Sequence, residues 1–201
     1  MSLEPLRRFV VATSGIVAAC EDEAQLRARV AELLADLVAR DSWLPEPLAE
    51  SDPERYRQYL LYADPLNRFS VVSFVWGPGQ FTPIHDHTVW GLIGMLRGEE
   101  RAQRFVLPAG GRPVPSGAPS LLRPGEVDAV SPSDASIGDL HQVSNAFDDR
   151  SSISIHVYGA NIGSVQRSIY PEPQRNGGGR RPFVSGYSNA WLPNLWHAPT
   201  P

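Results

Sequence analysis

Residues 77–98 read GPGQFTPIHDHTVWGLIGMLRG and place two histidines between regularly spaced glycines. His85 and His87 are separated by one residue, just before a run of apolar residues typical of a β-strand. Alternate side chains of an extended chain point to the same side, about 6 to 7 Å apart at Cα, so both imidazoles can bind one metal ion. The intervening Asp86 points to the opposite side, where we expect a structural or supporting role.

The spacing from Gly79 to Gly98 is similar to the first motif of the cupin superfamily, Gly-x5-His-x-His-x3-Glu-x6-Gly. Gly91 stands where that motif usually has a glutamate ligand. Residues 138–145, GDLHQVSN, match the end of the second cupin motif, Gly-x2-His-x3-Asn. The resemblance implies a mostly β protein, a cupin β-barrel or jelly roll, with an α-helical N-terminal cap. It also implies a metal ion held by His85, His87 and His141.

The chain of 201 residues is expected to form a single domain, because a usual domain has about 150 residues. Its expected parts are a helical cap (1–66), a β-barrel core (67–170) and a packed C-terminal tail (171–201). Apolar residues at helical spacing predict helices over 3–20, 22–39 and 52–62. Asp22 followed by Gln25 resembles a capping box, and Asp52 followed by Pro53 is typical of a helix start.

From Phe69 onward, β-branched and aromatic runs alternate with glycine and proline, which is typical of a sandwich or small barrel. The predicted strands are 69–76, 89–96, 104–107, 126–130 and 153–158. Residues 108–119 and 171–182, rich in proline and glycine, are predicted to be loops. The aromatic tail is expected to pack back on the domain, and His197 is expected to be structural or exposed.

The composition indicates a small-molecule partner in the cytoplasm. Lys and Arg number 18 against 22 Asp and Glu, a net charge of -4 without a basic run, which favours neither nucleic acid nor membrane. Cys20 is the only cysteine, which excludes an intramolecular disulfide and fits a reducing compartment. Residues 7–20 resemble a bacterial lipoprotein signal, but Glu4 and the interruption at 13–15 argue against that reading.

The three histidines leave several chemistries open. Three neutral imidazoles leave a divalent ion its full charge and open positions, which favours an anionic ligand such as a thiolate. Such a site suits Fe(II) and O2, yet three histidines also describe a catalytic zinc site. A zinc- or manganese-dependent hydrolase or isomerase therefore stays open, although no carboxylate is obviously placed as its base. A non-catalytic cupin binding module is the other alternative.

Ser154, His156 and Tyr158 alternate along one predicted strand, so their side chains share a face and can form a hydrogen-bonded chain. Three polar groups on an inward face would be costly to bury unless they bonded to one another. This favours a functional relay over ordinary core positions. A Ser-His hydrolase is less well supported, because the chain has no Gly-x-Ser-x-Gly segment.

The chain from about Tyr56 to Tyr158 is similar to the thiol dioxygenases, which include cysteine dioxygenase and bacterial 3-mercaptopropionate dioxygenase. The matching segments are 76–77, 84–88, 96–98, His141 and 154–159. The resemblance implies oxidation of a small thiol carboxylate with O2 to its sulfinic acid. It implies one Fe(II) per chain at the three histidines. It also implies that the hydroxyl of Tyr158, oriented by His156 and Ser154, reaches toward substrate and oxygen.

Two departures from the mammalian cysteine dioxygenases bear on the substrate. Gly91 lies near the position of their crosslinked cysteine, so a Cys–Tyr crosslink cannot form here. Their carboxylate-binding Tyr-x-Arg is replaced by Tyr-Arg-Gln at 56–58, and Gln58 resembles the 3-mercaptopropionate type. That type implies Arg167 as the carboxylate partner, with an exposed surface arginine as the alternative. Another alignment would replace Gln58 by Arg57 or Tyr59.

Overall fold

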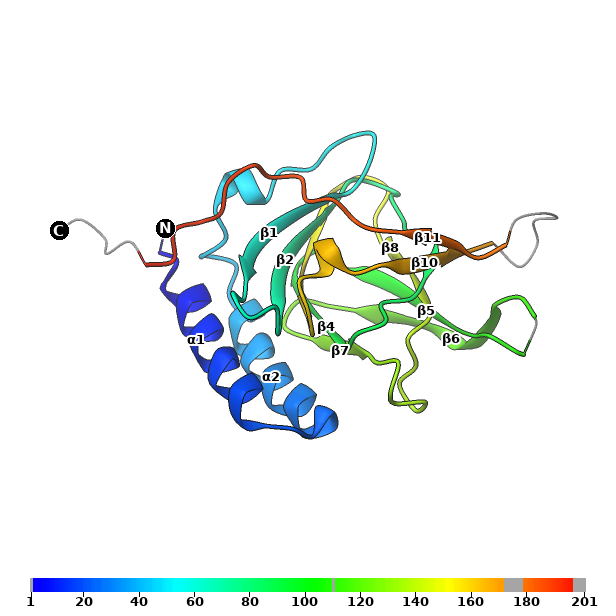
Figure 1. The fold of residues 1–201 in the computed structure, drawn as a ribbon. Coiled ribbons are helices and arrows are strands. Elements are labelled where there is room, and N and C mark those ends of the chain that lie inside the picture. Colours follow the sequence, from blue (N-terminus) through cyan, green and yellow to red (C-terminus); the bar gives the residue numbers. More distant parts are fainter. Residues whose placement is uncertain (1, 110, 172–178, 197–201) are drawn as a thin grey trace.

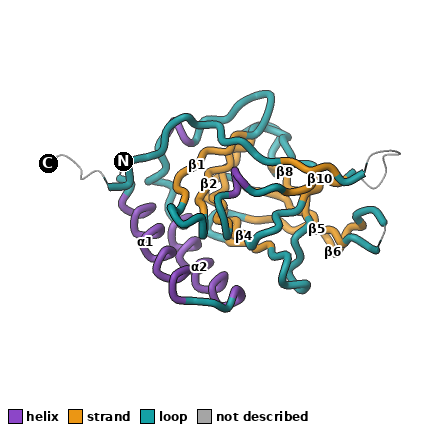
Figure 2. Tube along the Cα trace, viewed as in Figure 1, coloured by secondary structure: helices purple, strands orange, loops and turns teal. Residues whose placement is uncertain are grey.

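A computed structural model describes residues 2–109, 111–171 and 179–196, and these form two antiparallel β-sheets with a pair of helices packed on one of them (Figures 1 and 2). The helices are α1 (Glu4–Ala19) and α2 (Glu23–Val38). The side chain of Asp22 accepts a hydrogen bond from the backbone nitrogen of Gln25 at 2.8 Å and caps α2. No helix within the described residues has the length and apolar character needed to cross a membrane.

The sheets form the two walls of a barrel. Within the described ranges the first sheet has the order β1 (Arg57–Ala63), β2 (Ser70–Trp76), β9 (Ser152–Tyr158), β4 (Gly91–Arg97) and β7 (Val127–Val130). The second has the order β11 (Arg181–Phe183), β10 (Arg167–Tyr170), β3 (Ile84–His85), β8 (His141–Asn145), β5 (Glu100–Val106) and β6 (Val114–Leu122). Two 3-10 turns, η1 (Glu46–Leu48) and η2 (Ile162–Ser164), lie in the connections.

The two faces of the first sheet pack against different partners. Outward residues of β9, among them Ile155 and Val157, join the large apolar core beneath the helices. Contact with α2 is close at Gly94 of β4, where an added Cβ would lie 2.8 Å from Leu34 Cγ. Because successive strand residues alternate, the inward face of the same strands points into the barrel and can carry polar groups. Tyr158 is one of these inward residues.

The helices expected over 3–20 and 22–39, and all five predicted strands, are confirmed. The third helix, expected over 52–62, is wrong: residues 57–63 form β1, which pairs antiparallel with β2. Tyr59 and Leu61 are buried on one side of β1, while Leu60 packs on the other side inside the barrel. This alternation, together with the ladder to β2, overrides the helical spacing of the tyrosines.

The loop expected over 108–119 is also wrong in part, because residues 114–122 form the exposed strand β6. In the segment expected as a loop over 171–182, the described residues include the start of β11. The tail then runs along β1 (Figure 1). The backbone nitrogen of Ser188 donates to the carbonyl of Gln58 at 2.7 Å, and Leu195 is buried. His197 lies outside the described residues.

Candidate metal centre

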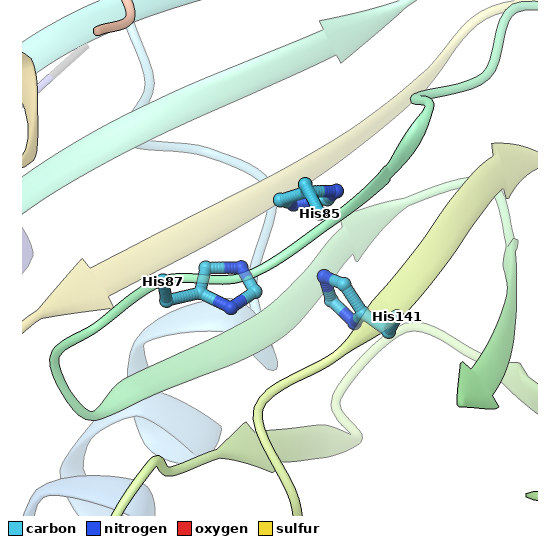
Figure 3. Close-up of side chains that lie close together, drawn as sticks. All are labelled: His85, His87 and His141. Atoms are coloured by element: carbon cyan, nitrogen blue, oxygen red, sulfur yellow. The ribbon is translucent and has the colours of Figure 1, made fainter. Parts of the chain in front are cut away.

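Three buried histidines meet inside the barrel (Figure 3). His85 ends β3 and stands directly opposite His141, the first residue of β8, while His87 lies in the turn that follows β3. One ligand nitrogen from each histidine lies within 4.8 Å of the other two. The pairing of β3 with β8 thus brings together histidines that are far apart in the sequence. The three predicted ligands therefore lie together in one cluster.

Hydrogen bonds orient two of the three rings. The Nδ1 of His85 lies 3.0 Å from the carbonyl oxygen of Pro83, and the Nδ1 of His87 lies 3.0 Å from Asp139 Oδ1. When Nδ1 carries the proton for these contacts, each Nε2 keeps a free lone pair for an ion. The Nδ1 of His141 is buried without a hydrogen-bond partner among the described residues. A buried nitrogen of this kind suits a ligand role.

The electrostatics of the cluster favour neutral imidazoles. Burial lowers the pKa of His85 well below its usual value, and the nearby His87 lowers it further. Burial lowers the pKa of His141 in the same way. A neutral imidazole is the form that binds a metal, and a set of three nitrogens suits divalent iron, zinc or manganese better than calcium or magnesium. The residues present therefore fit a divalent transition-metal ion.

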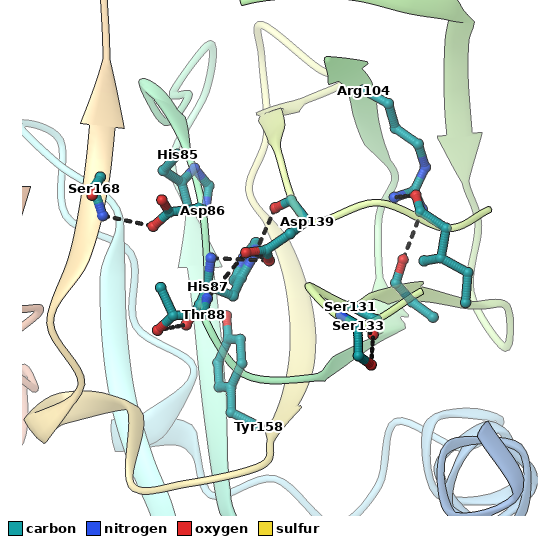
Figure 4. A network of polar contacts seen from close by, with 12 residues as sticks. His85, Asp86, His87, Thr88, Arg104, Ser131, Ser133, Asp139, Tyr158 and Ser168 are labelled. Carbon is teal, nitrogen blue, oxygen red and sulfur yellow. Dashed lines mark hydrogen bonds and ion pairs between the residues drawn. The ribbon is translucent and has the colours of Figure 1, made fainter. Parts of the chain in front are cut away.

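Asp139, which the sequence reading did not single out, supports the cluster from the loop before β8 (Figure 4). Its carboxylate accepts hydrogen bonds from the backbone nitrogens of His87 at 3.0 Å and Thr88 at 3.1 Å, besides its contact with the His87 ring. Burial raises the pKa of Asp139, but the hydrogen bonds from His87 and Thr88 outweigh it and leave the pKa lowered. The carboxylate therefore stays ionised and fixes the orientation of the His87 ring.

Asp86 points away from the cluster, as the strand alternation predicts. Its carboxylate accepts a hydrogen bond from the backbone nitrogen of Ser168 at 2.6 Å (Figure 4). It accepts a second one from the hydroxyl of Tyr170 at 2.8 Å. These two hydrogen bonds attach the segment that carries His85 and His87 to β10. Asp86 therefore has a structural role.

The expected chain of polar residues is present along β9. Ser154 Oγ lies 2.8 Å from His156 Nε2, and His156 Nδ1 lies 2.8 Å from the Tyr158 hydroxyl. All three side chains are buried, and the Tyr158 ring stacks on His87 with centroids 5.8 Å apart. Burial raises the pKa of Tyr158 and lowers that of His156 well below its usual value. Both residues are therefore neutral, and the tyrosine keeps its proton.

A cavity of about 220 Å³ opens beside the cluster. Its lining includes His85, His141, His156, Tyr158, Gln58 and Arg167. A space of this volume is suited to a small molecule rather than to a polymer. The structure thus brings the candidate ligands, the polar chain and both expected substrate residues to one place.

Gln58 and Arg167 both line this cavity, and each has a buried polar atom without a partner among the described residues. Arg167 is 3% exposed, so it is not a surface arginine, and its guanidinium bonds Ser185 Oγ and lies over the Phe183 ring. Its Nε and the Oε1 of Gln58 have no hydrogen-bond partner within the described part of the chain. Buried donors and acceptors normally have partners, so the two unpartnered atoms mark the side chains of Gln58 and Arg167 as candidates to bind a ligand.

The alternative residues for the position of Gln58 point elsewhere. The guanidinium of Arg57 forms an ion pair with Asp52, and the hydroxyl of Tyr59 donates to the carbonyl of Glu50 at 2.8 Å. Neither residue lines the cavity, whereas Gln58 does. The register of β1 therefore favours Gln58.

Gly91 leaves no room for the glutamate that the cupin motif usually carries. An added Cβ would lie 2.8 Å from Val130 Cγ2 and 3.1 Å from Tyr158 Cδ1. The absence of a side chain lets the Tyr158 ring lie against the backbone of β4. Gly91 thus explains both why the candidate ligand set has no glutamate and how the Tyr158 ring can lie where it does.

A small antiparallel barrel with three convergent histidines and a buried cavity defines a metal-binding barrel of the cupin type. The sequence profile of the family described as cysteine dioxygenase type I matches residues 16–168, and the chain belongs to this family. The family implies a thiol dioxygenase, an oxidoreductase. The expected fold, mostly β and cupin-like with an N-terminal helical cap, is confirmed.

Similar solved structures include an uncharacterized conserved protein with a double-stranded beta-helix domain from Klebsiella pneumoniae subsp. pneumoniae MGH 78578. It is 15% identical, with a TM-score of 0.48 over 66% of this chain and 100% of that one. A cupin superfamily protein from Desulfitobacterium hafniense DCB-2 is 14% identical, with a TM-score of 0.44 over 61% and 94% of the two chains. TT1209 from Thermus thermophilus is 20% identical, with a TM-score of 0.43 over 57% and 92%.

Proposed function

We propose that this protein is an Fe(II)-dependent thiol dioxygenase that converts a small thiol carboxylate and O2 into a sulfinic acid, with 3-mercaptopropionate preferred over L-cysteine. The observation that carries this proposal is the lining of a single buried cavity. Histidines of the candidate metal cluster and the buried guanidinium of Arg167 both face it. A thiolate is a good ligand for such a metal site, and a guanidinium is a good partner for a carboxylate.

Iron bound by His85, His87 and His141 would supply the redox chemistry that adds both atoms of O2 to sulfur. The chain's own residues bind and orient the substrate. The guanidinium of Arg167 holds the carboxylate, and the side chain of Gln58 lines the same cavity. Apolar and aromatic walls, which include Phe74 and Phe183, exclude water around the sulfur.

Tyr158 lines the cavity and carries a hydroxyl that can act on this chemistry. Its hydroxyl bonds His156 on one side, and its ring stacks on the metal-binding His87 on the other. Because Tyr158 keeps its proton, it can donate a hydrogen bond to substrate or oxygen in the cavity. His156 and Ser154 hold the hydroxyl in place for that role.

The hydrolase or isomerase alternative needs a carboxylate base beside the metal. The cavity lining within the described residues contains no Asp or Glu. Family membership also supports the dioxygenase. We further infer a cytoplasmic location and small-molecule partners rather than nucleic acid or a membrane, since the chain has one cysteine and a net charge of -4 without a basic run.

Oxygen uptake by the Fe(II)-loaded protein tests the proposal, with 3-mercaptopropionate, L-cysteine and propanethiol compared at equal concentrations. We expect uptake to be fastest with 3-mercaptopropionate and weakest with propanethiol, which has no carboxylate for Arg167. Both atoms of labelled O2 should appear in the sulfinic acid. Preference for cysteine would contradict the assignment of Gln58 as the specificity residue, and no uptake with any thiol would overturn the dioxygenase.

Arg167→Gln provides the matched test of carboxylate binding. It should raise the KM for 3-mercaptopropionate more than tenfold, because a hydrogen bond to a charged group contributes about 1.5–3 kcal/mol. The rate with propanethiol should stay unchanged. An equal loss with both thiols would show that Arg167 supports the fold rather than the carboxylate.

A further inference from the structure

Glu100 is a buried carboxyl group that the proposed mechanism does not use. It is the first residue of β5, stands opposite Asn145 of β8 in register, and is 2% exposed. Its Oε1 has no hydrogen-bond partner among the residues that the structure describes. An ionised carboxylate in such a place is costly, so the position calls for a proton or a specific partner.

The carboxyl group lies at the inner end of the polar chain on β9. It is close enough to the Ser154 hydroxyl and the Trp76 indole for both to stabilise its charge. Trp76 Nε1 also donates to Ser154 Oγ at 3.4 Å. Ser154, His156 and Tyr158 then follow at 2.8 Å steps toward the cavity. Glu100 therefore lies beside the inner end of a line of hydrogen-bonded groups that leads to the cavity.

The donors and acceptors in this line are coupled, because neutral His156 has one N–H and one free lone pair. An ionised Glu100 can only accept, so Ser154 donates to it and accepts from His156 Nε2–H. The free Nδ1 of His156 then accepts the Tyr158 proton. A protonated Glu100 reverses every step: Ser154 donates to Nε2, Nδ1–H donates to the Tyr158 oxygen, and the Tyr158 proton is free for the cavity.

We propose that Glu100 is a positioning residue that sets the direction of this hydrogen-bond chain, so that Tyr158 donates into the cavity only when Glu100 carries a proton. The consequence for catalysis rests on the proposed function, but the coupling itself does not. One proton passed from Tyr158 into the cavity, and replaced stepwise through His156 and Ser154 from protonated Glu100, leaves Glu100 ionised and converts the second arrangement into the first.

The surroundings of Glu100 place its titration near neutral pH. Burial is the largest influence and raises the pKa of Glu100. Hydrogen bonding from Ser154 and Trp76 lowers it, and the charge of Asp128 on β7 raises it. Together these effects bring the pKa to about 7. The facing titratable groups on β9, His156 and Tyr158, are neutral, and Asn145 on β8 has no charge. Both protonation states of Glu100 are thus accessible at physiological pH.

The tautomer of His156 reports the direction of the chain without any turnover. We would record nitrogen-15 spectra of the full chain with Zn²⁺ at the histidine cluster, and assign His156 from the His156→Gln variant. The expected result is protonated Nδ1 at pH 6 and protonated Nε2 at pH 8.5. Glu100→Gln, whose amide can donate to Ser154 at any pH, should keep Nδ1 protonated throughout.

Two further variants test the path. Ser154→Ala removes the connecting hydroxyl and should abolish the pH dependence of the tautomer even though Glu100 is still present. Glu99→Gln makes the same chemical change at the neighbouring residue, whose side chain is 30% exposed, and should behave as the wild type. A wild-type tautomer that does not change with pH, or a change that persists in Glu100→Gln, would overturn the proposal.

The rate of thiol oxidation provides the second readout. In the wild type it should fall about tenfold for each pH unit above the pKa of Glu100, as expected for one essential proton. In Glu100→Gln this decline should be absent. If the tautomer changes as expected but no thiol is oxidised, the coupling between Glu100 and Tyr158 is supported and the proposed dioxygenase function is wrong. A decline that is identical in both proteins would overturn the link between Glu100 and catalysis.

Discussion

Asp139 holds His87 through both its ring and its backbone. One carboxylate oxygen lies 3.0 Å from the ring Nδ1 and 3.0 Å from the backbone nitrogen of His87, and the other accepts from Thr88. Thr88 has a φ of 60°, in the left-handed region that a β-branched residue rarely adopts. The carboxylate therefore stabilises a strained turn that aims the imidazole at its two partners.

We expect Asp139→Asn to weaken metal binding by about 10- to 100-fold, because the partner of a ligating histidine fixes its tautomer and orientation. Competition with a chromophoric chelator measures the affinity. Asp149→Asn, at an exposed aspartate, is the control and should bind as the wild type. Unchanged affinity in Asp139→Asn would show that the turn alone positions His87.

The ligand assignment predicts that His85→Ala and His141→Ala each lose bound metal. Two imidazoles with open positions bind a divalent ion far more weakly than three. Metal content after dialysis, together with near-ultraviolet circular dichroism to verify folding, measures the effect. His156→Gln should retain the metal, since His156 bonds Ser154 and Tyr158 instead. Full occupancy in either alanine variant would refute the cluster.

Removal of the Tyr158 hydroxyl separates binding from turnover. Tyr158→Phe should keep the iron and slow oxygen uptake by about 100-fold, the usual effect of a positioned proton donor. The ring still packs on His87 and Gly91, so folding should be preserved. Parallel measurement of iron content and uptake rate distinguishes the two roles. Unaltered kinetics would remove Tyr158 from the mechanism.

Gly91→Ala tests how tightly β4 positions Tyr158. The new methyl group would meet Val130 Cγ2 at 2.8 Å, so the strand or its neighbours must shift, at a cost of about 1–3 kcal/mol. We expect slower oxygen uptake with normal iron content, because the ligands are elsewhere. Gly15→Ala, where an added Cβ meets nothing within 4 Å, should instead stabilise α1. Normal activity and stability of Gly91→Ala would contradict close packing here.

The buried carboxyl of Glu100 also predicts how stability depends on pH. Its pKa rises from 4.5 to about 7 on folding, so the folded state holds the proton more tightly. This stabilisation is complete below pH 4.5 and is lost as the pH rises through 7. Relative to the wild type, Glu100→Gln should therefore gain about 3 kcal/mol in the free energy of unfolding between pH 4.5 and pH 8. Urea unfolding at both values measures it, and an equal difference at both would refute the shift.

Where local pattern and tertiary environment agree, the sequence predicted the structure well. Asp22 caps α2 as expected, and the alternation of Ser154, His156 and Tyr158 places all three on the inward face of β9. The helical spacing of the tyrosines before β2 predicted a helix where the chain forms β1. The antiparallel pairing of β1 with β2 stabilises the strand more than the local spacing favours a helix. Pairing with another strand, even the next one along the chain, is not visible in the residue spacing of one segment alone.

The residues of the candidate site differ in the same way in how far the sequence could predict them. The histidines and Tyr158 could be found because the motifs hold them at fixed spacings. Glu100 and Asp139 could not, since Glu100 lies outside both motifs and Asp139 occupies a variable position of the second one. Glu100 meets Ser154 across the barrel, and Asp139 meets His87 only when β3 and β8 come together. Only the register of the sheets reveals such pairs.

Strand β6 forms one outer edge of the six-stranded sheet, and most of its residues are exposed. Pro115 and Pro119, which made this segment look like a loop, have no backbone N–H. An exposed strand edge can pair with a strand from another molecule and begin aggregation. Two missing donors interrupt any such ladder. The prolines of β6 therefore protect the barrel against fibril-like growth from this edge.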